Sequence, residues 1–131
     1  MITRTLLKTA FFITLLAFGY AGVAAAQSSN DTRLAALADE EGCEFPELPT
    51  VPEAEGATME QMVATQGAIQ DYMTVSNELL ECLEGITNNE DLPEEDRQLA
   101  IEGYNAEVDA QESLAARWNE ERTRFLEMQQ Q

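Results

Sequence analysis

The chain has 131 residues, with 25 acidic side chains against seven basic ones, which gives a formal net charge of −18. A surface this negative repels phosphate groups, so the composition excludes nucleic acid as a partner and disfavours anionic membrane surfaces. The sequence contains no histidine. Ser–His and Cys–His nucleophiles are therefore excluded, and zinc and ferritin-like di-iron sites, which normally use histidine, are disfavoured.

The first 26 residues have the three parts of a cleavable export signal. Arg4 and Lys8 give a positive start, an uncharged apolar run follows, and three alanines ending at Ala26 fit a cleavage site before Gln27. The uncharged stretch is only marginally long for a bilayer, so an uncleaved anchor is the weaker alternative. We expect a signal peptide over 1–26 and a periplasmic or secreted mature protein, with no stable membrane association after cleavage.

Cleavage would remove the only lysine and leave all the acidic residues in the mature chain. This excess of carboxylates keeps the protein soluble and favours cationic partners if it binds any. The simplest interpretation is a solvated acidic surface. The mature chain keeps five basic residues, Arg33, Arg97, Arg117, Arg122 and Arg124.

Two segments precede the main helical region. Residues 27–42 are polar around a short apolar run, which indicates either one or two helical turns or a loose segment. Residues 43–57 carry proline at every third position from Pro46 to Pro52, a spacing that suits polyproline II with its three residues per turn. We predict that 43–57 is an extended arm packed on the helices, with a proline-rich ligand for a partner as the alternative. The apolar stripe of this arm would comprise Phe45, Leu48 and Val51.

Residues 58–131 predict two amphipathic helices, over about 58–85 and 92–128. Thr58 and Gln61 form a capping-box pattern at the start of the first helix. Gly85 is expected to end that helix as a left-handed C-cap. Because the connection between the helices is only a few residues long, we expect them to pack antiparallel as a hairpin.

The apolar residues of both helices follow a heptad, as in a coiled coil, and form faces too wide for two helices to cover. A homodimer that forms a four-helix bundle would cover the remainder. Polar residues within the heptad fix register or a partner helix in some proteins, although a half-buried seam explains them equally well. The polar positions are Gln66, Ser76, Gln111 and Arg122.

Cys43 and Cys82 are the two cysteines of the chain. In an oxidising compartment an even pair predicts a disulfide. From Thr58 to Cys82 the helix spans about 36 Å, and an extended arm from Cys43 to Thr58 reaches about 46 Å. The arm is therefore long enough to run back along the helix and place the two cysteines together, which would add a third layer to a small core.

No pattern in the sequence predicts a catalytic, cofactor-binding or metal site, and we do not expect an enzyme. Carboxylates are the only abundant functional group. The turn over 88–96 is acidic enough to hold calcium, but it lacks the alternating ligands and central glycine of an EF-hand. Glu78, Glu81 and Glu84 are expected on the exposed side of their helix, where paired-carboxylate hydrolysis would have no cleft.

Several short runs resemble a family of small, uncharacterised exported proteins of Gram-negative bacteria. The similarity extends over about 43–126 and depends mainly on the two cysteines and the spacing of the prolines. It implies an envelope protein with a helical hairpin and brings no functional residue with it. The further runs that carry the resemblance are 57–62, 79–83, 104–106 and 117–119.

We therefore expect a non-enzymatic exported envelope protein with a structural or protein-interaction role. Its partner would be an unknown protein or a second copy of the chain. The alternative is a periplasmic acidic binding module for divalent cations or for a cationic peptide, which the net charge of the mature chain suggests.

Overall fold

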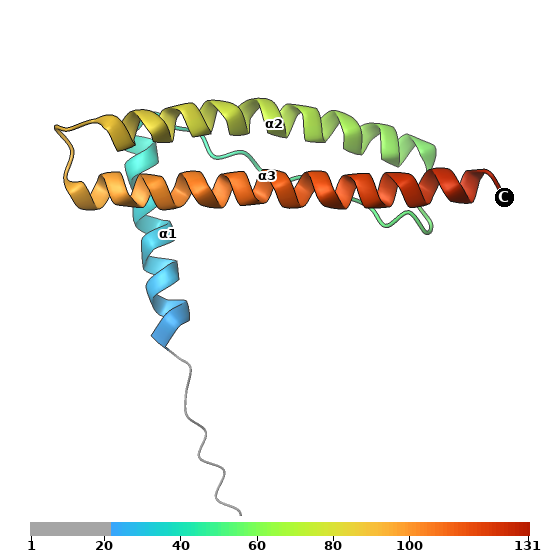
Figure 1. Cartoon of the computed structure of the whole chain (residues 1–131), viewed down its shortest axis with the longest axis horizontal. Coiled ribbons are helices and arrows are strands. Elements are labelled where there is room, and N and C mark those ends of the chain that lie inside the picture. The colour runs from blue at the N-terminus through green and yellow to red at the C-terminus, as the bar shows by residue number, and fades with distance from the viewer. Residues whose placement is uncertain (1–21) are drawn as a thin grey trace, which may run out of the picture.

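The computed structural model describes residues 22–131, which fold into three helices with no strand among them: α1 (Gly22–Glu41), α2 (Met59–Asn88) and α3 (Glu94–Gln129). This confirms the all-α class expected from the sequence. Helices α2 and α3 run side by side in opposite directions, and α1 crosses them near the connection between the two (Figure 1). The expected signal peptide lies mostly outside the described residues.

The start of α2 has the capping box that the sequence predicts. The backbone N–H of Gln61 donates to the hydroxyl oxygen of Thr58 at 3.1 Å, and the backbone N–H of Thr58 donates to the side-chain oxygen of Gln61 at 2.8 Å. Two amide groups that an uncapped helix end would leave without partners are thereby satisfied.

The end predicted for this helix is wrong. Gly85 lies inside α2 without a positive φ, and the helix continues to Asn88, with Asn89 as its C-cap. Continuing the helix buries the side chain of Ile86 in the core beside Leu83. Burial of this side chain stabilises the helical conformation more than the weak helix propensity of a single glycine opposes it.

Residues 27–42, which the sequence left open between short helix and loose segment, form most of α1. Leu37 and Ala38 are buried where α1 crosses the α2–α3 pair. Arg33 adds ion pairs to the first turn of α3, at 3.2 Å from Glu95 and 2.6 Å from Asp96. The crossing therefore combines a small apolar contact with exposed charge pairs, each of which contributes little alone.

Gly42 turns the chain out of α1. Its φ is +76°, and its backbone N–H donates to the carbonyl of Asp39 at 3.3 Å, while the N–H of Cys43 donates to the carbonyl of Ala38 at 2.8 Å. This pair of bonds is a Schellman motif, in which glycine takes the left-handed position at no steric cost. The motif fixes the direction in which Cys43 leaves the helix.

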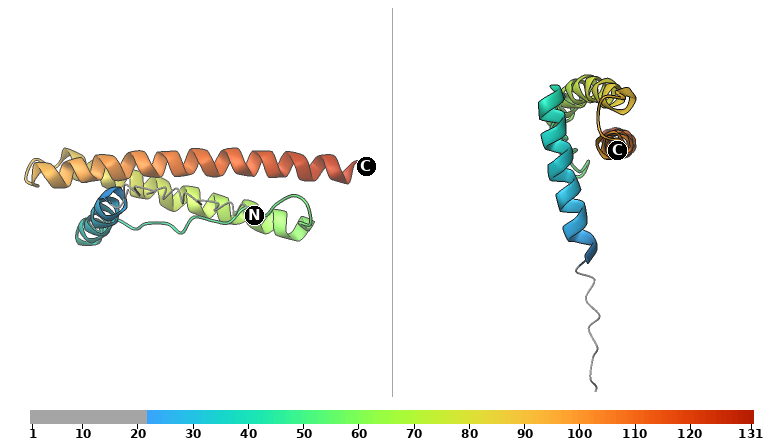
Figure 2. Two further views of the ribbon diagram at one scale, coloured as in Figure 1. Left: turned by 90° about the horizontal axis from the view of Figure 1, so that it is seen from below. Right: turned by 90° about the vertical axis from the view of Figure 1, so that its left-hand side faces the viewer.

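Residues 43–57, called the 43–57 segment below, contain no helix and run along the α2–α3 pair from the end of α1 towards the start of α2 (Figure 2). Val51 and Ala54 are buried against the two helices. Phe45 and Leu48 are 43% and 55% exposed. Only the last member of the apolar stripe predicted for this segment is therefore buried in the core.

None of the helices within residues 22–131 is long and apolar enough to span a bilayer.

Gly103 of α3 is expected to set how closely α1 packs, because a Cβ at this position would lie 2.6 Å from the Cδ2 atom of Leu34. Replacement Gly103→Leu should push α1 away and destabilise the fold by about 1–3 kcal/mol. Hydrogen exchange should speed up in α1 more than in α2 and α3. The matched control is Gly67→Leu, since a Cβ at Gly67 meets nothing within 4 Å; equal exchange in both variants would contradict the packing role of Gly103.

Candidate functional site

Cys43 and Cys82 form the predicted disulfide, with their Cα atoms 5.7 Å apart and a separation of 39 positions in sequence. The bond attaches the start of the 43–57 segment to the last third of α2. Cys43 packs against the core cluster that contains Leu79 and Leu83. The crosslink thus holds α1, α2 and the segment together at one point.

A second contact fixes the far end of the 43–57 segment. The backbone N–H of Ala54 donates to the carboxylate of Glu121 on α3 at 2.8 Å. The side chain of Glu121 is buried, with Arg124 as a cationic neighbour at 3.6 Å. The hydrogen bond satisfies both the buried carboxylate and the amide, because leaving either group buried without a partner would cost about 1–3 kcal/mol of folding free energy.

A polar cluster lies between α2 and α3 near the middle of the pair. The hydroxyl of Tyr72 donates to Oε1 of Glu107 at 2.7 Å, and the hydroxyl of Ser76 donates to the same oxygen. The side-chain amide of Gln111 donates to the Ser76 oxygen at 2.7 Å. Ser76 and Gln111, two of the polar positions noted in the heptad, therefore meet in the structure, whereas Glu107 was not anticipated.

Burial, together with the hydrogen bond to the Glu107 carboxylate and the negative charge of that group, raises the pKa of Tyr72 to about 12. The phenol therefore stays protonated and acts as a donor well above neutral pH. One carboxylate held by two hydroxyl donors suits a structural role, since each donor keeps its partner satisfied.

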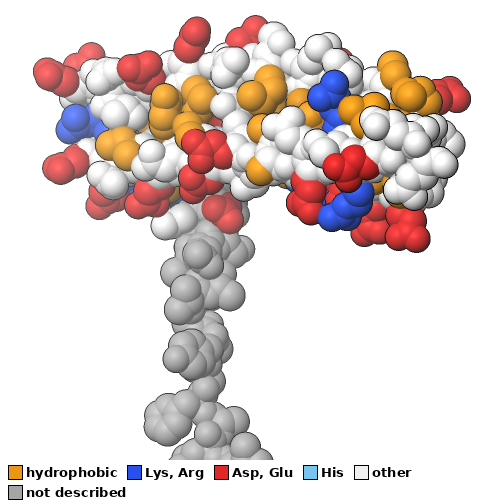
Figure 3. Space-filling view, turned by 45° about the vertical axis from the view of Figure 1, so that its right-hand side comes forward, with side chains coloured by type: hydrophobic (Ala, Val, Ile, Leu, Met, Phe, Trp, Pro, Cys, Tyr) orange, Lys and Arg blue, Asp and Glu red, His pale blue; other side chains and the backbone are white. Residues whose placement is uncertain are grey.

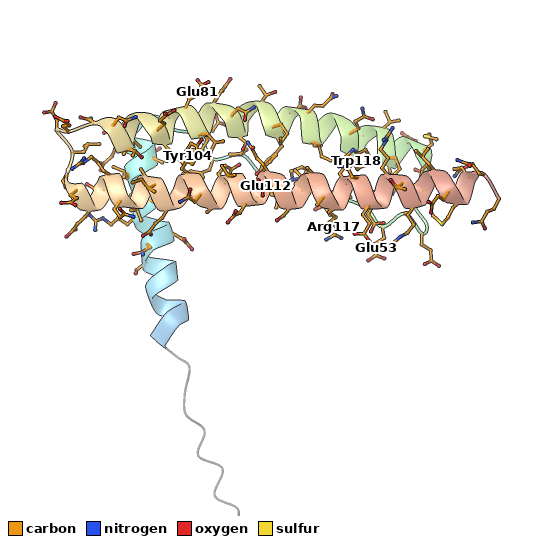
Figure 4. The ribbon with its side chains drawn as sticks, in the orientation of Figure 1. Glu53, Glu81, Tyr104, Glu112, Arg117 and Trp118 are labelled. Carbon is orange, nitrogen blue, oxygen red and sulfur yellow. A yellow bond between two sulfur atoms is a disulfide. The ribbon has the colours of Figure 1, made fainter. Side chains whose placement is uncertain are left out.

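The other carboxylates named from the sequence do not converge. Glu78, Glu81 and Glu84 are exposed on α2, and Figure 4 shows Glu81 on the outer edge of that helix, directed away from α3. Among the described residues, no three His, Cys, Asp or Glu side chains gather closely enough to hold a metal ion. The remaining polar heptad positions, Gln66 and Arg122, line one shallow pocket beside Trp118.

A concave surface with both apolar and charged groups lies between the 43–57 segment and α2, and has a volume of about 580 Å³. It is called the segment groove below. Its wall includes the exposed side chains of Phe45 and Leu48, and no basic residue lines it. Three carboxylates stand along the groove, those of Glu44, Glu47 and Asp71.

Part of this groove could be predicted from the sequence, because the spacing of the prolines and the stripe of Phe45 and Leu48 is evident in the residue pattern. The exposure of the Phe45 and Leu48 side chains could not be predicted. It depends on how the buried residues Val51 and Ala54 anchor the segment on the helices.

The chain matches no protein-family model, and no curated protein or solved structure is similar enough to it to indicate a family or an activity. The resemblance to a family of small exported proteins therefore stays a prediction.

The disulfide should dominate the stability of the domain. It closes a loop of 39 residues, and the chain-entropy relation assigns about 4 kcal/mol to a loop of this length. The double variant Cys43→Ser/Cys82→Ser should lose a similar free energy of unfolding in urea titrations. A dithiothreitol-treated wild-type sample is the control, and an unchanged transition midpoint in both would show that the crosslink does not stabilise the fold.

Alkaline pH should weaken the fold through Tyr72. The pKa of Tyr72 is about 12 in the folded chain and about 10 in an unfolded one. The contribution of the protonated phenol to the free energy of unfolding is therefore complete below pH 10 and is lost as pH rises from 10 to 12. In thermal melts across this range, Tyr72→Phe should lose less stability with pH than the wild type does. Tyr104→Phe is the control and should follow the wild-type curve. Parallel curves for all three proteins would contradict the assignment.

Proposed function

We propose that the protein is a non-enzymatic, exported interaction module that acts in the periplasm or outside the cell. The disulfide supports this proposal, because such bonds persist in oxidising compartments and are rare in the cytosol. The export-signal pattern of residues 1–26 supports it independently.

The fold feature behind this proposal is a scaffold in which α2 and α3 form a hairpin and the 43–57 segment is an arm pinned on it. The Cys43–Cys82 bond holds the start of the arm, and the Glu121 carboxylate holds Ala54 near its end. A segment ordered before binding loses less conformational entropy when a partner arrives. The polyproline pattern adds stiffness between the two fixed points.

The segment groove is the proposed binding surface, and the exposure of Phe45 and Leu48 is the observation that carries it. Large apolar side chains on a preorganised extended segment, beside three carboxylates, fit an extended peptide that has both basic and apolar side chains. Apolar contacts would supply affinity and the carboxylates would select a cationic partner. This favours the cationic-peptide form of the alternative function over the binding of divalent cations.

Two synthetic peptides of equal length test this function, one built from Arg and Leu and one from Glu and Leu. Fluorescence anisotropy should detect binding of the basic peptide and much weaker binding of the acidic one. Phe45→Ser/Leu48→Ser should weaken the basic peptide about tenfold, since two buried apolar contacts are lost. Val63→Ser/Leu126→Ser removes two exposed apolar side chains elsewhere and should leave affinity unchanged.

A charge-matched pair separates a specific groove from general attraction to an acidic protein. Glu44→Gln/Glu47→Gln should weaken binding of the basic peptide more than Glu78→Gln/Glu81→Gln, although both changes alter the net charge equally. Equal weakening by the two double variants, together with no effect at Phe45 and Leu48, would overturn the proposed site.

A further inference from the structure

The shallow pocket beside Trp118 has a volume of about 190 Å³ and lies between the start of α2 and the end of α3. It is called the Arg122 pocket below. Two of its lining residues, Met62 and Phe125, are buried in the core cluster that contains Ala54, so its floor is fixed by packing. The pocket is therefore formed before any ligand arrives. Its rim consists of exposed apolar side chains, those of Met59, Val63 and Leu126.

Arg122 is the one charged residue that lines this pocket. Figure 3 shows a basic side chain bordered by hydrophobic ones towards the right-hand end of the body. Arg33 and Arg124 pair with carboxylates, whereas Arg122 makes no ion pair with any residue between 22 and 131. An exposed guanidinium without a partner, beside an apolar pocket, is available to an anionic group of a ligand.

The carboxylates nearest to Arg122 in sequence or across the pair leave this position free. Glu121 is directed towards the 43–57 segment, where it accepts the N–H of Ala54. Glu112 is ten residues earlier in α3, which is about 15 Å along the helix. Glu60 follows Met59 but does not line the pocket. The net negative charge of the protein repels anions at long range, but salt at about 0.15 M screens this repulsion beyond about 8 Å.

We propose that the Arg122 pocket binds an amphipathic carboxylate, that is, a short acyl chain that ends in a carboxylate. The chain would occupy the apolar pocket, and the carboxylate would pair with the guanidinium of Arg122. A planar guanidinium can donate two parallel hydrogen bonds to one carboxylate, which fixes the orientation of the ligand. This inference goes beyond the proposed function, which concerns a cationic peptide in the segment groove.

The volume of the pocket limits the length of the acyl chain. A space of 190 Å³ corresponds to about six water molecules at roughly 30 Å³ each, and a methylene group is of similar size. Octanoate, with six methylene groups, is therefore a suitable ligand. The unbranched side chains of Met59 and Met62 can adjust to the shape of such a chain, because the thioether is flexible and polarisable.

Binding of octanoate can be followed through Trp118, which is the single tryptophan of the chain and lines the pocket. Titration of the exported, disulfide-bonded protein at about 0.15 M salt should shift the emission to shorter wavelength in a saturable manner, because the acyl chain displaces water from the indole. Equilibrium dialysis of labelled octanoate should give one binding site per chain. Absence of saturable binding in the dialysis would overturn the proposal.

Three ligands with the same chain and different head groups test the role of the charge. Octanoate should bind about tenfold more tightly than octan-1-ol, since only the carboxylate forms charge-assisted hydrogen bonds with the guanidinium. It should also bind more tightly than octylammonium, although the net charge of −18 attracts the cation. A preference for octylammonium over octanoate would contradict the proposed site.

A matched pair of variants tests the assignment to Arg122. Arg122→Gln should weaken the binding of octanoate by about tenfold and leave that of octan-1-ol unchanged. Arg117→Gln is the control, because Arg117 is also exposed on α3 but does not line this pocket. The two changes alter the net charge equally, so equal losses of octanoate affinity would show a general charge effect and overturn the site.

A second pair of variants tests the apolar part of the site. Leu126→Ser should weaken octanoate and octan-1-ol alike, by about two- to fourfold, since apolar contacts are lost. Met128→Ser removes an exposed apolar side chain outside the pocket and should change neither affinity. Equal effects of the two variants would overturn the placement of the chain. Phe45 and Leu48 do not line this pocket, so failure of octanoate binding and failure of peptide binding are separate results.

Discussion

The Cys43–Cys82 bond is the constraint on which the arrangement of the other parts depends. Two helices cannot bury enough apolar surface to hold each other, and a domain of this size needs a covalent or additional packed element. The disulfide is the covalent element, and it also holds two further packed elements in place. It fixes the end of α1 on α2 and sets the point where the 43–57 segment begins. The Ala54–Glu121 hydrogen bond then determines where the segment ends on α3. Between these two points the segment has little freedom, and its outward side chains are held in place.

Local signals made part of this structure predictable from sequence. The capping box at Thr58, the helical class and the disulfide follow from short-range pattern and from compartment, and all three are confirmed. Contacts between distant residues account for what was missed. Gly85 continues a helix because Ile86 finds a buried position, and Glu121 looks in sequence like its exposed neighbour Glu120 until Ala54 is placed beside it. The exposure of Phe45 likewise depends on where the rest of its segment is anchored.

The distribution of charge divides the surface of the molecule into regions with different binding properties. Carboxylates line the segment groove with no basic residue beside them, whereas Arg122 lines the shallow pocket beside Trp118. Strong net charge keeps copies of a protein apart at long range, but salt screens this repulsion beyond about 8 Å.

The disulfide also turns part of the chain into a covalent ring. Residues 43–82 are closed by the bond, so a protease that cuts the exposed 43–57 segment once opens the ring without separating α1 from the rest of the molecule. A nicked chain would keep its mass under non-reducing conditions. A cut in this exposed segment, which lies outside the helices, therefore does not release a fragment while the disulfide is intact.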